Sequence, residues 1–315
     1  MKQDFSFTVS GLDDYVNNNV DAPLILKEIF KGRSIDTFTP VLANTGDNRL
    51  NVLDVSTELG DGLVCDPDAA GGATFTQRTL TATPVQVTKA YCAKDFFKKW
   101  QSQLAVTQLG EMPLEETITE AELQEIAKAN EKAVWLGDTA GGSPAPFTDL
   151  FDGILEIIAT AEVKEASSIS EGSPGVHVDT IIDIIDEMMD ETDSDILTSD
   201  LILYMGPDAF MTLVRALRKV NAFASDYHAI TGDRFRLIHP YYPNLEVVAT
   251  DGLATTDKFV LTLKGNIYYP IPENADDITV EWNPGSGKDK NVYFLANYLM
   301  GVQIGRPEYV TVNWS

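Results

Sequence analysis

The sequence predicts an α+β fold, and three observations lead to this prediction. Residues 41 to 88 have the pattern of a long β-hairpin, because two strand-like arms flank a tip rich in glycine and aspartate. Residues 118 to 136 carry apolar side chains at helical spacing and form the clearest helix pattern in the chain. Residues 201 to 219 pass from a buried strand into a helix, and a series of short strands follows. Separate groups of strands and helices are typical of an α+β protein.

Length, composition and charge limit the class of protein. At 315 residues, with 44% hydrophobic and 23% charged residues, the chain is an ordinary globular protein of one large or two medium domains. No apolar run approaches the roughly 20 residues of a membrane span, and no secretory signal is expected at the N-terminus. The two cysteines, Cys65 and Cys92, are expected to be free thiols.

The net charge of −25 argues against recognition of nucleic acid, because phosphate binding requires a basic surface. Such a charge has two interpretations. It simply keeps the protein soluble, or it belongs to a shell that encloses nucleic acid without its inner surface binding to it. Charge alone leaves both interpretations open.

The N-terminal elements are an arm and the hairpin. Residues 12 to 31 carry apolar side chains at mostly helical spacing, with Pro23 suited to a first turn and Gly32 to a helix end. The hairpin at 41 to 88 has too few apolar residues for a core of its own, and isolated hairpins are marginal in water. We therefore expect it to lie on another subunit.

The central elements are helical. A short helix is expected from residue 94 to 109. The helix at 118 to 136 then begins with a capping box, Thr117 with Glu120 or Thr119 with Glu122, and ends at Gly137. Its length of roughly 27 Å suits a spine across a flat domain. Loops at 137 to 146 and 171 to 175 enclose an apolar stretch, and the second loop is the expected domain switch.

The second half of the chain predicts an α/β unit and a β-rich end. Residues 176 to 191 form an amphipathic helix with an acidic outer face. A buried strand at 201 to 205 turns through Gly206-Pro207 into a basic-ended helix. The strands that follow are expected at residues 235–238, 245–250, 258–263, 267–271, 278–282 and 292–314.

A search for chemistry yields no catalytic, cofactor or metal site, so the protein is not expected to be an enzyme. His177, His228 and His239 lack metal-ligand spacing and are expected to cap or pack. The acidic run 190 to 195 lacks the glycine and glutamate of a calcium loop. Gly285-Ser-Gly-Lys288 lacks the first glycine and the Ser or Thr of a phosphate-binding loop.

The order of these elements resembles the major capsid protein of tailed bacteriophages, a fold that encapsulin shells also use. Residues 75 to 96 match the second arm of the extended loop, and residues 131 to 138 match the exit of the spine helix. Residues 298 to 313 match the closing strands of the peripheral domain. The resemblance implies an N-terminal arm (1–40), an extended loop (41–90), a peripheral domain (91–175 and 291–315) and an axial domain (176–290).

The resemblance also implies a function. The chain is expected to assemble with itself into hexamers and pentamers, which form an icosahedral shell around packaged double-stranded DNA. Such a protein belongs to the virion and assembles in the host cytoplasm, with no contact to a membrane. A portal and a separate scaffolding protein are implied partners, since no long charged helix precedes the arm, and a decoration protein is a further candidate.

The extended loop supplies the candidate interface residues. Glycines for close approach and charges for ion pairs are expected there, namely Arg49, Glu58, Asp61, Gly71, Gly72 and Arg78. Some family members join their subunits covalently through a lysine of this loop. Residues 41 to 88 contain no lysine, so we expect no covalent link through it.

Two alternatives remain open at this stage. An encapsulin-type nanocompartment shares the fold and differs in enclosing protein cargo rather than DNA. An α/β ligand-binding protein or enzyme would instead have a pocket around Tyr241-Tyr242 or Tyr268-Tyr269, and its hairpin would fold back on its own domain.

Overall fold

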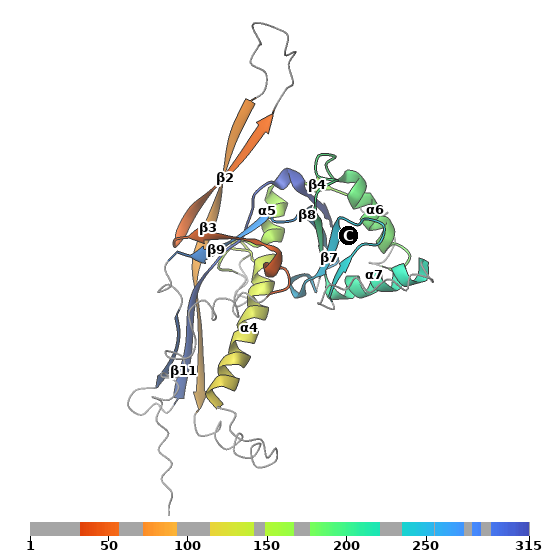
Figure 1. Cartoon of the computed structure of the whole chain (residues 1–315). Coiled ribbons are helices and arrows are strands. Elements are labelled where there is room, and N and C mark those ends of the chain that lie inside the picture. The colour runs from red at the N-terminus through yellow and green to blue at the C-terminus, as the bar shows by residue number, and fades with distance from the viewer. Residues whose placement is uncertain are drawn as a thin grey trace, which may run out of the picture.

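The structure is a computed structural model of the chain. It describes residues 32–56, 72–92, 114–141, 149–166, 177–220, 235–254, 256–273, 279–284 and 291–314. The predicted N-terminal helix at 12 to 31, the short helix at 94 to 109 and the hairpin tip lie outside the described residues. The described elements confirm the α+β class (Figure 1).

The strands form three sheets. A four-stranded antiparallel sheet has the order β10 (Thr279–Pro284), β11 (Asn291–Met300), β3 (Gly72–Cys92) and β2 (Gly46–Ser56). A three-stranded sheet has the order β1 (Thr39–Ala43), β9 (Ile267–Pro272) and β12 (Gln303–Ile304). A six-stranded mixed sheet has the order β4 (Lys164–Glu165), β13 (Val310–Asn313), β8 (Phe259–Leu263), β5 (Leu201–Met205), β7 (Leu245–Ala249) and β6 (Arg236–Ile238).

The described α-helices are α4 (Leu114–Leu136), α5 (Ile154–Thr160), α6 (Ile181–Glu191) and α7 (Pro207–Val220). In the same part of the chain lie three short 3-10 helices, η1 (Ile35–Thr37), η2 (Asp251–Leu253) and η4 (Pro307–Tyr309). The spine helix is confirmed, although α4 begins four residues before the predicted start. Among the described residues, no helix is long and apolar enough to cross a membrane.

The six-stranded sheet is buried on both faces, and each face belongs to a different core. Side chains of β5 alternate, so that Ile202 and Tyr204 join the core beneath α4, while Leu201, Leu203 and Met205 join the core beneath α6 and α7. Figure 1 shows α6 and α7 on one side of this sheet and α4 and α5 on the other. Trp135 of α4 packs against Tyr204 with ring centroids 5.0 Å apart.

The predicted hairpin differs from the structure at its first arm. β2 pairs with β3 from Gly46 opposite Ala82 to Ser56 opposite Gly72, whereas residues 41–43 belong to β1, which runs parallel to β9. Gly46 has a φ of +102° and turns the chain between β1 and β2, a conformation that favours glycine. Local pattern alone does not separate β1 from β2, because the partner of β1 lies more than 220 residues away.

The division of the chain into peripheral and axial domains stays a prediction. The six-stranded sheet takes β4 and β13 from the expected peripheral ranges and β5 to β8 from the expected axial range.

Candidate functional site

The outer half of the β2–β3 hairpin projects away from the body of the molecule (Figure 1). Near its base, Leu50, Leu80 and Ala82 are buried under the rest of the chain. Residues 72 to 77 of β3 are all exposed, so neither face of this part of the strand is covered. The outer half of the hairpin is therefore well paired, but the described residues do not cover its side chains.

One face of this outer hairpin carries an exposed apolar pair. Leu53 and Phe75 are cross-strand partners and remain 46% and 71% exposed. Directly paired residues share one face of a sheet, so the two side chains form a single apolar pair. On the same face the polar pair of Asn51 and Gln77 comes next, followed by Arg49 opposite Thr79.

The base of the hairpin is fixed by the C-terminal strands. Arg306 donates from Nη2 to the carbonyl oxygen of Leu53 at 2.9 Å, and Gln303 donates from Nε2 to that of Thr79 at 2.6 Å. Across the pair of strands, Gln77 donates to Asn51 at 3.0 Å. These contacts hold the direction of the arm without covering its apolar face.

The predicted interface residues that the structure describes do not form one cluster. Arg49 lies on the outward face, but Arg78 pairs with Leu50 and lies on the opposite face. Gly72 lies at the end of β3 opposite Ser56. Glu58, Asp61 and Gly71 lie outside the described residues. Leu53 and Phe75 were not among the predicted interface residues, although their apolar character in an otherwise polar arm was the available signal.

A second feature, the Glu131 junction, joins three segments beneath the spine helix. Glu131 Oε1 accepts hydrogen bonds from the backbone nitrogen of Ser34 at 3.0 Å, from Ser34 Oγ at 2.6 Å and from Thr250 Oγ1 at 2.5 Å. Trp135 donates from Nε1 to Ser34 Oγ at 2.9 Å. The start of the described chain, α4 and the end of β7 are thus tied to one carboxyl group.

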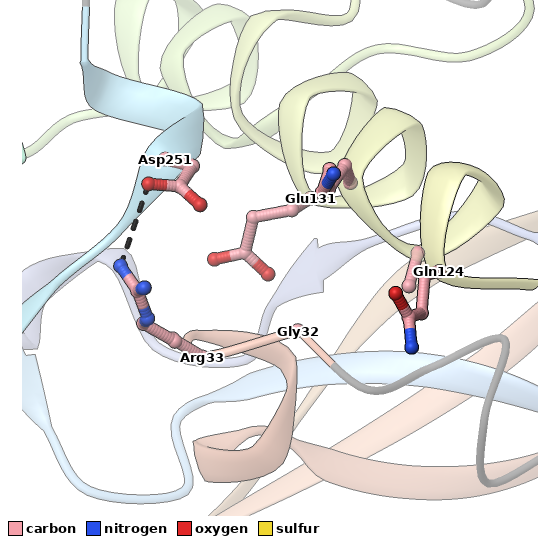
Figure 2. Close-up of a pocket in the computed structure, with 7 residues that line it drawn as sticks. Gly32, Arg33, Gln124, Glu131 and Asp251 are labelled. Atoms are coloured by element: carbon pink, nitrogen blue, oxygen red, sulfur yellow. Dashed lines mark hydrogen bonds and ion pairs between the residues drawn. The ribbon is translucent and has the colours of Figure 1, made fainter. Parts of the chain in front are cut away.

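The other oxygen of Glu131 has different surroundings. Within the described residues Oε2 is buried and accepts no hydrogen bond. Figure 2 shows the carboxyl group pointing from α4 toward Gly32, where a Cβ atom would lie 1.9 Å from Oε2. Burial raises the pKa of Glu131, and the hydrogen bonds from Ser34 and Thr250 oppose this shift.

A hollow of about 200 Å³ lies beside this junction. Arg33 and Asp251 form an ion pair of 3.4 Å across it, and Gln124 lines it from α4 (Figure 2). Charges of both signs line the hollow, which does not favour an anion or a cation. No cluster of three metal-ligating side chains occurs in the part of the chain that the structure describes.

His239 has the packing role expected of it, whereas the expected role of the His177 side chain stays a prediction. His177 lies just before α6, where its carbonyl oxygen accepts from the backbone nitrogens of Thr180 and Ile181. His239 is fully buried and stacks on Tyr242 with ring centroids 5.2 Å apart. Tyr242 donates to Asp186 at 2.8 Å, so this tyrosine packs against α6. His228 lies outside the described residues.

Comparison by sequence finds no relative: no family model matches the chain, and no curated protein matches it. Comparison by structure finds proteins of one fold. A chain of the satellite phage P4 procapsid matches with a TM-score of 0.57 at 10% identity, covering 98% of this chain and 99% of that one. A chain of Gordonia phage Cozz matches with a TM-score of 0.55 at 14% identity, covering 89% and 84%.

An encapsulin is equally similar. The SrpI encapsulin of Synechococcus elongatus matches with a TM-score of 0.54 at 10% identity, covering 98% of this chain and 95% of that one. At these identities the likeness establishes the fold alone. The chain has the tailed-phage capsid fold, as its element order predicted.

Proposed function

From this fold we propose that the chain is a structural shell protein, which assembles with copies of itself into rings and then into a closed particle. The observation that carries the proposal is the uncovered outer hairpin with Leu53 and Phe75 on one face. A single exposed leucine needs no explanation, but an exposed cross-strand pair on a projecting arm is typical of a contact surface. A neighbouring copy provides the surface that the arm lacks.

The finer proposal is the major capsid protein of a tailed phage. In this proposal the hairpin lies across a neighbour, the sheet with α6 and α7 surrounds the centre of each hexamer or pentamer, and the remaining elements form the outer wall. Double-stranded DNA would be enclosed, with a scaffolding protein, a portal and a decoration protein as further partners. The phage structures among those of the same fold support this proposal.

A nanocompartment shell is the second candidate, supported by the encapsulin of the same fold. The two candidates differ in contents rather than in chain architecture. Particles purified from the native source would contain DNA in the first case and a protein cargo in the second.

Electron microscopy of the purified chain, together with size-exclusion chromatography, tests the proposal. We expect rings or hollow particles for the wild type. Leu53→Asp with Phe75→Asp should leave a folded monomer and raise the protein concentration required for assembly at least tenfold, because it places charge in a buried contact. Thr74→Asp with Thr76→Asp adds the same charge to the opposite face of the arm and should have a smaller effect.

The contrary result is equally clear. A wild-type chain that stays a monomer or dimer at every salt and protein concentration, with a hairpin resistant to protease, would contradict the shell proposal.

A further inference from the structure

The outer surfaces of α6 and α7 carry opposite charges. Residues 177 to 195, which include α6, contain eight Asp or Glu and no Lys or Arg, whereas residues 209 to 220 of α7 contain three Lys or Arg and no Asp or Glu. We define the acidic α6 face by Asp183, Glu187, Asp190 and Glu191. We define the basic α7 face by Met211, Val214, Arg215 and Arg218.

The basic α7 face is apolar as well as charged. Met211 and Val214 are 46% and 36% exposed, and they lie one helical turn from Arg215 and Arg218. Within the described residues neither arginine has an ion-pair partner, whereas the adjacent Lys219 pairs with Asp179. Cations in the last turn complement the helix dipole, but this accounts for Arg218 and Lys219 rather than for Arg215 one turn earlier.

The acidic α6 face is electrostatically unfavourable in the isolated chain. Asp183 with Glu187, and Glu187 with Glu191, place like charges at a spacing of four residues, where they repel. Asp190 and Glu191 lie in the last turn, which carries no basic residue and where the helix dipole disfavours negative charge. A cationic surface from outside the chain would reduce both the repulsion between these acidic side chains and their unfavourable interaction with the helix dipole.

The placement of the two helices determines which contact can satisfy both faces. α6 and α7 cover the same side of the six-stranded sheet, with α6 above α7 at the right of Figure 1, whereas the hairpin projects at the upper left. A two-fold contact of α6 with α6 would oppose like charges. A rotation that brings α6 of one copy against α7 of the next places one acidic face against one basic face at each contact. The same contact then repeats around a closed ring.

We propose that the basic α7 face of one copy binds the acidic α6 face of the neighbouring copy within each ring. The proposal rests on the proposed shell function and specifies its contact around the ring centre. Charge complementarity and the exposed Met211 and Val214 favour a second copy over nucleic acid, since phosphate contacts do not require apolar side chains.

A charge-swap experiment tests this contact. Variant A carries Arg215→Glu and Arg218→Glu, and variant B carries Asp183→Lys and Glu187→Lys. Each alone should need at least a tenfold higher protein concentration to assemble than the wild type, because like charges meet at every contact. Mixed in equal amounts, A and B should form hexamers within about threefold of the wild-type threshold, since alternating copies restore an attractive contact at all six positions. A pentamer has an odd number of copies, so alternation restores at most four of its five contacts.

Two controls separate this contact from general effects. Arg215→Lys with Arg218→Lys keeps the charge and should assemble. Lys128→Glu with Lys132→Glu, on the exposed side of α4, makes the same change in net charge as variant A and should assemble nearly as the wild type does. Circular dichroism and thermal melting establish that each variant is folded.

The outcomes are distinct. A wild type that forms no rings overturns the shell function itself. A wild type that assembles together with a variant A that assembles equally well overturns only the α6–α7 contact. If A and B each fail and their mixture forms no hexamers either, the faces do not meet each other, and a different partner, such as nucleic acid or a second protein, binds the basic α7 face.

Discussion

Glu131 is a buried acid whose two oxygens lie in different surroundings, and this difference determines how it affects stability. Oε1 accepts three hydrogen bonds, while Oε2 accepts none in the described part of the chain. Burial raises the pKa of Glu131 because it penalises the charged carboxylate, and the hydrogen bonds to Oε1 oppose this shift.

Two substitutions of Glu131 separate its hydrogen bonds from its charge. Glu131→Ala removes the acceptor of Ser34 and Thr250 and should lower the free energy of unfolding by about 3 kcal/mol. Glu131→Gln keeps an acceptor and removes the titration. When folding raises the pKa of a group, the group stabilises the fold fully at pH values below its pKa in the unfolded state. This contribution is lost as pH rises through its pKa in the folded state.

The wild type should therefore lose stability relative to Glu131→Gln as pH rises above about 4.5. Urea unfolding of both proteins between pH 4 and pH 8 measures the difference. A difference that is constant across this range would show that Glu131 does not titrate differently on folding.

His239 makes the free energy of unfolding depend on pH in the opposite direction to Glu131. Burial lowers the pKa of His239 to about 4, although Asp186 partly opposes the shift. Because the pKa is lowered, the neutral ring stabilises the fold fully at pH values above its pKa in the unfolded chain, near 6.5. This contribution is lost as pH falls toward 4. Between pH 7.5 and pH 5 the loss should be about 2 kcal/mol.

His239→Phe should abolish this loss. In the described residues neither ring nitrogen of His239 has a hydrogen-bond partner, so phenylalanine loses no bond and keeps the stacking on Tyr242. Chemical denaturation at pH 7.5 and pH 5 gives the two free energies of unfolding. His177→Gln is the matched control, because His177 is exposed and its removal should leave the pH dependence intact. Equal pH dependence in wild type and His239→Phe would contradict the assignment.

At the scale of elements, the sequence was most informative where the hydrophobic pattern is local. β5 is observed at the predicted residues, 201 to 205, and α7 begins at Pro207 after the predicted turn. The strand follows from a run of apolar residues and the helix from apolar residues at helical spacing, and both patterns lie within about 20 residues of sequence. The helix at 176 to 191 begins later than predicted, at Ile181, after a turn at residues 178 to 180.

The elements that were not predicted depend on distant partners. β1 is a strand because it pairs with β9, and no pattern between residues 39 and 43 identifies that partner. Glu131 contacts Ser34 and Thr250, 97 and 119 positions away, so its role could not be derived from the helix around it. A buried charge within an apolar helix stripe was the only local indication. The candidate interface on the hairpin stays a prediction, and its apolar pair of Leu53 and Phe75 was not selected, because only glycines and charged residues were considered.

At the scale of the whole molecule, the net charge of −25 opposes any assembly of identical copies. This repulsion acts over the Debye length, which falls from about 10 Å at 0.1 M salt to about 3 Å at 1 M. The proposed contacts act at shorter range. The apolar pair of Leu53 and Phe75 is insensitive to this screening, and ion pairs in a partly buried helix contact are screened much less than distant charges.

The protein concentration required for assembly should therefore fall as NaCl rises from 0.1 M to 1 M, because salt removes the repulsion more than it weakens the contacts. Light scattering at graded protein concentrations measures the threshold, and electron microscopy establishes that the scattering comes from regular particles. The variant with Arg215→Glu and Arg218→Glu adds negative charge and also makes the α6–α7 contact repulsive, so its threshold should fall more steeply with salt. A wild-type threshold that rises with salt would mean that ion pairs between copies outweigh the net repulsion. The shell would then be held mainly by charge rather than by the apolar surface of the hairpin.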